Sequence, residues 1–443
     1  MRKKLKPTNT GLNVRDILLH GRTLDFQDRA QFFYDWHKNL REQGADGLHQ
    51  RTILSPIDRE VRVRDHKGLE QNMLMFGSNS YLGLGTHPLV KQRVVEAMEK
   101  YGTGVGGPPL LNGYTELHRQ LERRLAEYEG TEDALLYGSG YSANVGLMSG
   151  MPTRGDIIIY DVHSHASFTD GVNLGSHKSL TFRPNDLDEL ESHLKATQQI
   201  EGNRFVGIEG VYSMDGDLAP LDEIIPLCRK YDAILVLDDA HGTGVTGPGG
   251  SGTASHFGLH GEVDITLGTF SKAFGMSGGF VACSSAVAEY LRLFSRSFVF
   301  SASLPPLTVG AVHGALDVLE QEPEVHQRLM ENVSYLADRL RELDLGFKPR
   351  EDTAVIPLPV PMDMHIRGAA HGFHKRGIFL NHIEYPAVPV ARQRFRISVM
   401  ARHTKGDLDI LIQAVQEVWD EFEPMPGDGQ TMPEPLPFSP GGE

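Results

Sequence analysis

Lys272 is the side chain whose surroundings in this sequence best suit covalent chemistry. It lies in the run Gly-Thr-Phe-Ser-Lys-Ala-Phe-Gly, after the short apolar segment 264–267. A lysine amine can form a Schiff base with an aldehyde, while Thr269 and Ser271 can hydrogen-bond a phosphate. These groups fit pyridoxal 5'-phosphate (PLP). A single loop lysine would more simply be solvated, so the prediction depends on two further segments.

The first of these segments is the apolar run 235–237, which ends in Asp238 and is followed three residues later by His241. Side chains at the C-terminal ends of parallel strands meet the ligand in α/β sheets. A carboxylate there favours a protonated pyridine nitrogen by about 1–3 pKa units, and the protonated ring is an electron sink. We therefore predict that Asp238 pairs with the ring nitrogen and that His241 reaches the phenolic oxygen.

The second segment is Asp-Val-His-Ser-His-Ala-Ser at 161–167, which follows the apolar run 156–160. A histidine at a strand end can stack on an aromatic cofactor ring, and we assign that role to His165. His163 receives no role. No cysteine, aspartate or further histidine lies at a typical ligand spacing from this pair, so no metal site is predicted.

Taken in order, these motifs resemble the α-oxoamine synthase family of fold-type-I PLP enzymes, from about Phe76 to about Asp409. The matching segments are 78–84, 110–113, 139–144, 164–167, 209–217, 238–241, 269–272, 300–306 and 394–398. Segments 269–272, 278–280 and 301–303 look closest to bacterial serine palmitoyltransferase, with 8-amino-7-oxononanoate synthase as another near member. Two departures stand out. Gly106-Gly107-Pro108-Pro109 replaces the Gly-Ser-Arg that often precedes Leu-Leu-Asn-Gly, which affects the expected substrate channel, and His163 replaces a small or acidic residue.

The resemblance implies a role for each matching residue. Lys272 would hold PLP, Asp238 would pair with the ring nitrogen and His165 would stack on the ring. The other implied cofactor contacts are at the phenolic oxygen from Ser213 and His241, and at the phosphate from Ser139, Gly140, Tyr141, Thr269, Ser271 and Ser301, the last from the partner subunit of a homodimer. Asn79 and Arg396 resemble the groups that bind the amino-acid carboxylate, and a guanidinium suits that ligand because it binds bidentately.

The reaction that the resemblance implies is a decarboxylative condensation of a small amino acid with an acyl thioester. It would proceed through an internal aldimine at Lys272 and a quinonoid intermediate, and would release CO2, a thiol and an α-amino ketone. Glycine, alanine and serine stay open as amino substrates, and acyl-CoA and acyl carrier protein as donors. Alternatives are transamination, retro-aldol cleavage and a non-catalytic partner subunit, although such a subunit is expected to lack the lysine.

Composition agrees with an ordinary enzyme of 443 residues, with 40% hydrophobic and 8% aromatic residues. The net charge of −15 argues against nucleic acid as a partner, because phosphate binding needs a basic surface. Two cysteines imply no disulfide framework and fit a reducing, cytoplasmic location. No secretory signal or transmembrane segment is predicted, and weak attraction of the basic segment 1–7 to anionic lipid stays open.

Helices alternate with short apolar strands from about 81 to 284, which predicts an α/β fold with a mostly parallel sheet. The strands expected are 134–137, 157–160, 205–208, 234–237, 265–267 and 280–283. Helices are expected at 26–40, 115–129 and 405–422, and a strand at 60–64. We predict a fold-type-I PLP-dependent transferase: an N-terminal arm and lead-in (1–80), a large PLP-binding domain (81–320), a smaller α+β C-terminal domain (321–423) and a disordered tail (424–443).

Overall fold

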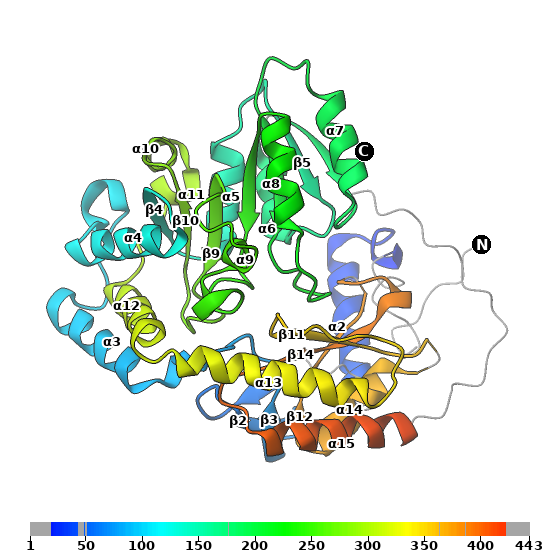
Figure 1. Ribbon diagram of the computed structural model, residues 1–443. Coiled ribbons are helices and arrows are strands. Elements are labelled where there is room, and N and C mark those ends of the chain that lie inside the picture. The colour runs from blue at the N-terminus through cyan, green and yellow to red at the C-terminus, as the bar shows by residue number, and fades with distance from the viewer. Residues whose placement is uncertain are drawn as a thin grey trace.

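The computed structural model describes residues 19–42, 48, 51–175, 177–362, 364–385 and 387–421. The basic segment 1–7 and the predicted tail 424–443 lie outside the described residues. Two layers are evident in Figure 1: a large sheet with helices on its faces, and a second body of strands and helices beneath it. The domain boundaries given above remain a prediction.

The large sheet has seven strands in the order β4-β10-β9-β8-β7-β5-β6. Their bounds are β4 Asp133–Tyr137, β10 Gly279–Cys283, β9 Ile265–Thr269, β8 Ala233–Asp238, β7 Arg204–Glu209, β5 Ile157–Asp161 and β6 Lys178–Phe182. The last five strands of that order are parallel to one another, and β10 is antiparallel to both β9 and β4. The mostly parallel sheet is confirmed, and six of its strands lie where the sequence predicts them.

Strand direction gathers the functional segments at one edge of the sheet. The parallel strands β5, β7, β8 and β9 all end there. Because β10 is antiparallel, its first residue Gly279 pairs with Thr269, the last residue of β9, and with Tyr137, the last residue of β4. The connection from β9 to β10, which holds Lys272, therefore starts and finishes at this edge.

Helices cover both faces of the sheet because alternate strand residues point to opposite sides. Phe205 of β7 belongs to a buried cluster with residues of α5 and α6, whereas Val206 and Ile208 pack in a cluster with residues of α7 and α8. The helices of this layer are α4 Glu116–Glu129, α5 Gly140–Gly150, α6 Ala166–Leu174, α7 Leu187–Ala196, α8 Leu221–Lys230, α9 Thr253–His256, α10 Ser285–Phe294 and α11 Arg296–Val299.

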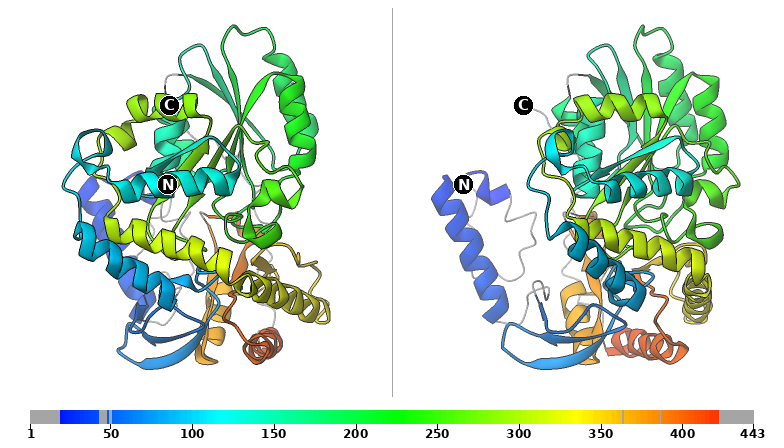
Figure 2. Two further views of the ribbon diagram at one scale, coloured as in Figure 1. Left: turned by 60° about the vertical axis from the view of Figure 1, so that its left-hand side comes forward. Right: turned by 90° about the vertical axis from the view of Figure 1, so that its left-hand side faces the viewer.

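The second body combines both ends of the described chain. One sheet has the order β1-β2-β3-β12, in which C-terminal β12 is parallel to N-terminal β3, and a second has the order β11-β14-β13. These strands are β1 Thr52–Ile53, β2 Glu60–Arg64, β3 Glu70–Met75, β11 Val355–Pro359, β12 Ile378–Phe379, β13 Asn381–Ile383 and β14 Arg394–Ser398. Its helices are α13 Glu324–Arg341, α14 Ile366–Lys375 and α15 Lys405–Glu421, seen with α2 Phe26–Glu42 in Figure 2.

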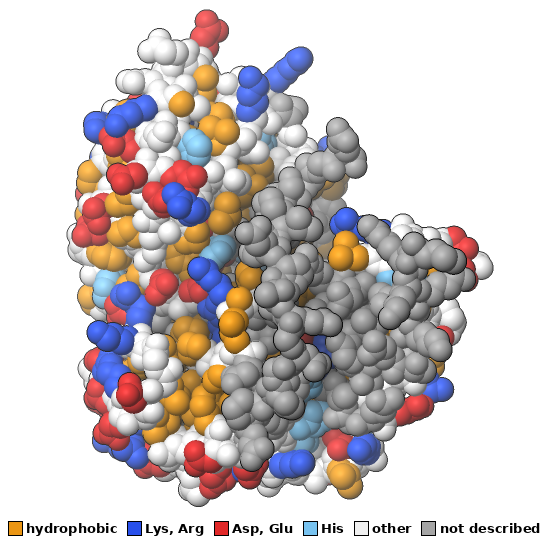
Figure 3. Space-filling view, turned by 90° about the vertical axis from the view of Figure 1, so that its right-hand side faces the viewer, with side chains coloured by type: hydrophobic (Ala, Val, Ile, Leu, Met, Phe, Trp, Pro, Cys, Tyr) orange, Lys and Arg blue, Asp and Glu red, His pale blue; other side chains and the backbone are white. Residues whose placement is uncertain are grey.

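Helices α3 (Pro88–Tyr101) and α12 (Pro306–Gln321) run side by side below the large sheet (Figures 1 and 2). Glycines allow this approach, because a Cβ at Gly310 would lie 2.6 Å from Ala97 Cβ. Among the described residues, no helix combines the length and apolar character that a membrane crossing needs. On the face shown in Figure 3, acidic and basic side chains are interspersed with apolar ones.

Candidate active site

Lys272 lies in a tightly held turn between β9 and β10. The Gly275 N–H donates to the Lys272 carbonyl at 3.0 Å, and the buried ring of Phe270 stacks on Phe280 with centroids 5.6 Å apart. Burial lowers the pKa of the Lys272 amine, and the nearby carboxylates of Asp238 and Glu209 oppose that shift. The positive charge of Arg396 lowers the same pKa further. Together these effects lower the pKa of Lys272 to about 8, so a larger fraction of the amine is neutral near physiological pH than for an ordinary lysine.

Asp238 ends β8 and is 6% exposed. Its Oδ1 accepts the Ala240 N–H at 3.2 Å, and its Oδ2 accepts a hydrogen bond from Asn144 Nδ2 at 2.7 Å. The register of the sheet places Asp238 beside Glu209, the last residue of β7. Burial raises the pKa of Glu209, and the negative charge of Asp238 adds to that rise. Two carboxylates thus adjoin the amine of Lys272.

His165 is the N-cap residue of α6, where its Nδ1 accepts the Ser167 N–H at 3.3 Å. The same nitrogen lies 2.7 Å from Ser167 Oγ, which in turn accepts a hydrogen bond from Asn144 Nδ2 at 3.0 Å. His165 also lies close enough to His241 to lower the pKa of that ring. A hydrogen-bonded chain therefore joins His165 to Asp238 through Ser167 and Asn144.

His241 is buried, and its Nδ1 lies 2.7 Å from the hydroxyl of Tyr81. Burial holds the pKa of His241 well below its ordinary value, and the positive charges of Lys272 and Arg396 act in the same direction. The ring is thus neutral at physiological pH. Burial also raises the pKa of Tyr81, which keeps its proton and can donate it to Nδ1.

Arg396 lies on β14 and reaches across to the large layer. Its guanidinium donates to Asn79 Oδ1 at 3.1 Å and to the Ser213 carbonyl at 3.4 Å. Its Nε is buried and has no hydrogen-bond partner. A guanidinium with an unsatisfied donor, next to an amide and close enough to act on Lys272, can accept a carboxylate.

The N-terminus of α5 begins directly against the end of β9. Ser139 caps the helix, and a Cβ at Gly140 would lie 3.0 Å from Thr269 Cβ. Thr269 Oγ1 lies 2.8 Å from Ser271 Oγ. Tyr141 is half exposed, and its hydroxyl donates to Asp170 rather than toward this turn. Helix-end N–H groups and two hydroxyls thus converge on one small region, as an anion requires.

These features fit PLP. Lys272 offers an amine of lowered pKa that would take the aldehyde, Asp238 a buried carboxylate that would pair with the ring nitrogen, and the start of α5 backbone N–H groups that would hold the phosphate. A neutral histidine with a fixed orientation, His241, adjoins the same amine. Among the described residues, no group of three or more histidine, cysteine or acidic residues is arranged to hold a metal ion.

Three predicted or noted residues do not bring their side chains into this hydrogen-bonded group. Ser301 is exposed in the connection between α11 and α12. Ser213 contacts the group through its backbone, because its N–H donates to Glu209 Oε2 at 3.1 Å. His163, which received no role, lies with its Nδ1 3.6 Å from Asp215 Oδ2. The contacts that Asp215 makes with His163 and with Arg394 lower the pKa of Asp215 to about 2.

Sequence reasoning assigned no role to Asn144, Ser167, Glu209 or Tyr81, which the structure places in direct contact with predicted site residues. Each one lies within or next to a segment that carries the family resemblance, and that position is the feature of the sequence that could have pointed to them. Their partners come from other strands and helices, so spacing along the chain does not reveal the contacts.

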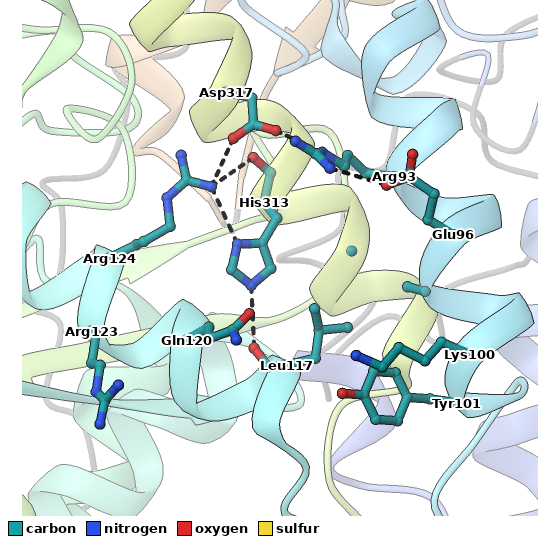
Figure 4. A pocket seen from close by; sticks show the side chains of 12 residues that line it. Arg93, Glu96, Lys100, Tyr101, Leu117, Gln120, Arg123, Arg124, His313 and Asp317 are labelled. Atoms are coloured by element: carbon teal, nitrogen blue, oxygen red, sulfur yellow. Dashed lines mark hydrogen bonds and ion pairs between the residues drawn. The ribbon is translucent and has the colours of Figure 1, made fainter.

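A separate cavity of about 550 Å³ lies between α3, α4 and α12 (Figure 4). Two of its arginines share one carboxylate: Arg93 Nε donates to Asp317 at 2.7 Å, and Arg124 donates to the same carboxylate at 2.8 Å. His313 Nδ1 accepts a hydrogen bond from Arg124 at 3.2 Å, and its Nε2 donates to the Leu117 carbonyl at 3.2 Å. None of the predicted site residues lines this cavity.

Comparison with known proteins identifies the family. Residues 71–415 match the family model described as aminotransferase class I and II. The 8-amino-7-oxononanoate synthase of Lysinibacillus sphaericus is 40% identical over 353 residues, which cover 80% of this chain and 90% of that relative. The serine palmitoyltransferase of Bacteriovorax stolpii is 36% identical over 357 residues, which cover 81% of this chain and 84% of that relative.

Solved structures agree. A serine palmitoyltransferase variant from S. paucimobilis with bound PLP–myriocin aldimine superposes with a TM-score of 0.81 at 29% identity, covering 90% of this chain and 99% of that chain. The 8-amino-7-oxononanoate synthase of Francisella tularensis gives a TM-score of 0.66 at 25% identity, covering 79% of this chain and 97% of that chain. The fold is therefore that of a fold-type-I PLP transferase. The chain belongs to the aminotransferase class I and II family, and it is a PLP-dependent α-oxoamine synthase.

Proposed function

We propose that this enzyme condenses a small amino acid, glycine, alanine or serine, with an acyl thioester to give an α-amino ketone. The donor proposed is acyl-CoA, with an acyl carrier protein as the alternative. The observation that carries the proposal is the guanidinium of Arg396, whose buried Nε lacks a partner beside Asn79 and the amine of Lys272. This arrangement offers a carboxylate site next to a base.

The residues divide the chemistry among themselves. PLP supplies an electron sink that stabilises negative charge at the amino-acid Cα. In this proposal Lys272 holds the cofactor and Asp238 pairs with its ring nitrogen, while His165 stacks on the ring. Ser213 and His241 contact the phenolic oxygen. The phosphate is held by Ser139, Gly140, Tyr141, Thr269, Ser271 and Ser301 of the partner subunit.

Arg396 and Asn79 bind the substrate carboxylate and so orient the Cα–H bond. The neutral amine of Lys272 takes the Cα proton, a task that its lowered pKa favours. A C–C bond then forms between Cα and the thioester carbonyl carbon, and the C–S bond breaks to release a thiolate, which takes a proton from solvent. Loss of CO2 breaks the bond from Cα to the carboxylate, and a proton replaces it, returned by Lys272.

The deciding experiment supplies the PLP-loaded enzyme with palmitoyl-CoA and glycine, L-alanine or L-serine separately. Thiol and CO2 released in equal amounts with one amino acid, together with the matching α-amino ketone by mass spectrometry, would support the proposal and name the substrate. A parallel reaction with palmitoyl carrier protein distinguishes the donors. A keto acid with pyridoxamine phosphate would instead indicate transamination, and an aldehyde with glycine a retro-aldol cleavage.

We also propose a cytoplasmic homodimer whose subunits share each site. Ser301 is exposed, the adjoining Phe300 is 75% exposed, and Leu111 on the nearby loop is 81% exposed. The two segments touch, since the Ser303 N–H donates to the Gly107 carbonyl at 3.1 Å. Mixing inactive Lys272→Ala and Ser301→Asp subunits should restore activity, because mixed dimers hold one intact site. Failure to recover activity in verified mixed dimers would contradict a shared site.

A further inference from the structure

Asn144 is the residue that joins the two sides of the candidate cofactor site. It lies in the second turn of α5 and is only 2% exposed. Its Nδ2 uses both protons, one toward Asp238 Oδ2 at 2.7 Å and the other toward Ser167 Oγ at 3.0 Å. The side chain is therefore committed to donating in two directions.

The orientation of this amide is fixed by charge. Turning it over would place Oδ1 against the carboxylate of Asp238, where two acceptors repel each other. In the observed orientation Oδ1 is buried without a hydrogen-bond partner. A buried unsatisfied acceptor costs stability, so the donors rather than the packing of Asn144 account for its presence.

The contacts also determine which nitrogen of His165 carries the proton. Nδ1 faces the backbone N–H of Ser167 at 3.3 Å, and a backbone N–H can only donate. Ser167 Oγ already accepts a proton from Asn144, so its own proton is directed to Nδ1, 2.7 Å away. Nδ1 is therefore an acceptor, and a neutral His165 ring carries its proton on Nε2.

We propose that Asn144 is a positioning residue that sets two groups at once: it holds Asp238 as a hydrogen-bond acceptor and, through Ser167, holds His165 in its Nε2–H form. The inference rests on the proposed function, because it concerns how that site is oriented. Asn144 touches neither PLP nor substrate in this assignment. It acts on the ring-nitrogen carboxylate and on the stacking histidine through one planar amide.

The test replaces Asn144 by leucine, which has a similar shape and no donors, and uses ¹⁵N NMR. One sample carries ¹⁵N-histidine, with the His165 signals assigned by their loss in His165→Gln. The other carries PLP labelled at its ring nitrogen. In the wild type we expect an unprotonated Nδ1 and a protonated Nε2 at His165. Asn144→Leu should shift both the His165 and the ring-nitrogen signals, and should lower kcat/KM about 10²-fold.

Two further variants separate the arms of the network. Ser167→Ala removes the link to His165 and leaves the contact of Asn144 with Asp238, so only the histidine signals should move. Asn332→Leu is the matched control. Asn332 is 8% exposed and also donates twice, to the carbonyls of Met400 and His403, so its loss should reduce stability without moving either signal.

Wild-type signals for both His165 and the PLP ring nitrogen in folded Asn144→Leu would overturn the inference. If the leucine variant does not fold, Asn144→Asp keeps the side-chain shape, and its second carboxylate beside Asp238 should move the ring-nitrogen signal. A wild-type ring-nitrogen signal in Asn144→Asp would likewise contradict the inference. These outcomes are independent of the proposed function, which fails only if the wild-type enzyme forms no α-amino ketone.

Discussion

Lys272 combines an ordinary side chain with an unusual environment, and that environment sets how readily it captures PLP. The nucleophile is the neutral amine, whose fraction at a given pH grows as the pKa falls below its ordinary value of 10.5. Burial and the charge of Arg396 both lower the pKa. Capture of PLP by the apo-enzyme should therefore accelerate with pH and level off below pH 10.5.

Stopped-flow absorbance of PLP binding from pH 6 to 10 checks this prediction. Arg396→Gln should move the profile to higher pH, because it removes a charge that lowers the pKa of Lys272. Arg396→Lys keeps the charge and should leave the profile nearly in place. Lys272→Ala should show no covalent capture. A profile that Arg396→Gln leaves unmoved would mean that the charge of Arg396 does not help to set the pKa of Lys272.

At position 396, a guanidinium should bind the substrate carboxylate more tightly than an ammonium group does. The planar fork of a guanidinium can hold a carboxylate with two parallel hydrogen bonds, which a lysine cannot do. Arg396→Lys should weaken amino-acid binding by about 1.5–3 kcal/mol, roughly 10–100-fold in Kd. Calorimetric titration of the PLP-loaded enzyme measures it. Arg394→Lys is the control, since Arg394 is paired with Asp215, and equal losses in the two variants would contradict a carboxylate site at Arg396.

The residues to which we assign chemistry could be proposed from the sequence where their type is itself informative. A lysine among hydroxyls, an acid at a strand end and a histidine after another strand can be interpreted without a structure. Asn144 could not be predicted in this way, because an asparagine within a helix has many roles. Its function depends on Asp238 and Ser167, which lie 94 and 23 residues away.

At the scale of elements, the start of α5 against the end of β9 makes a prediction about the phosphate subsite. A methyl group at position 140 would lie 3.0 Å from Thr269 Cβ and 3.1 Å from its Oγ1. Gly140→Ala should therefore displace the Thr269 hydroxyl and weaken PLP binding by about 1–3 kcal/mol, the usual cost of overpacking.

Equilibrium dialysis of the apo-enzyme with PLP measures this loss. Gly155→Ala is the matched control, because a Cβ at Gly155 meets no atom within 4 Å. An unchanged PLP affinity in Gly140→Ala would place the phosphate elsewhere than at the start of α5.

Elements were predicted best where they are buried on both faces. Strands β5, β7, β8, β9 and β10 are almost wholly buried and read as apolar runs. The edge strand β6 was not predicted, because Lys-Ser-Leu-Thr-Phe is largely exposed and has no apolar run. The helix at 115–129 was predicted from its apolar stripe and from Gly130, which adopts φ 72° at the C-terminus of α4.

At the scale of the whole molecule, the site depends on the second body being seated against the large layer. Arg394 donates to the Met214 carbonyl at 3.0 Å, and Thr353 Oγ1 donates to the Gly216 carbonyl at 3.0 Å. These contacts fix the loop that Arg396 touches at Ser213. The parallel pairing of β3 with β12 was not predicted, since the two strands are about 300 residues apart and their short sequences carry no signal for each other.

His403 lies where the two ends of the described chain meet, and it should make global stability depend on pH. Its Nδ1 accepts the Met400 N–H at 3.1 Å and its Nε2 lies 3.0 Å from the Met75 carbonyl. Burial lowers the pKa of His403 from 6.5 to about 4. Between these values the unfolded chain binds a proton at His403 and the folded chain does not, so stability falls as pH falls.

The loss attributable to His403 should reach about 3 kcal/mol by pH 4, since each pKa unit corresponds to about 1.4 kcal/mol. Urea unfolding of the apo-enzyme at pH 7.5, 6, 5 and 4 measures it. His403→Gln should be less stable at pH 7.5, because it disturbs a buried contact, yet should lose about 3 kcal/mol less than the wild type on acidification. His66→Gln, at an exposed position, should follow the wild type. Parallel pH profiles for the wild type and His403→Gln would show that the neutral ring of His403 does not limit stability in acid.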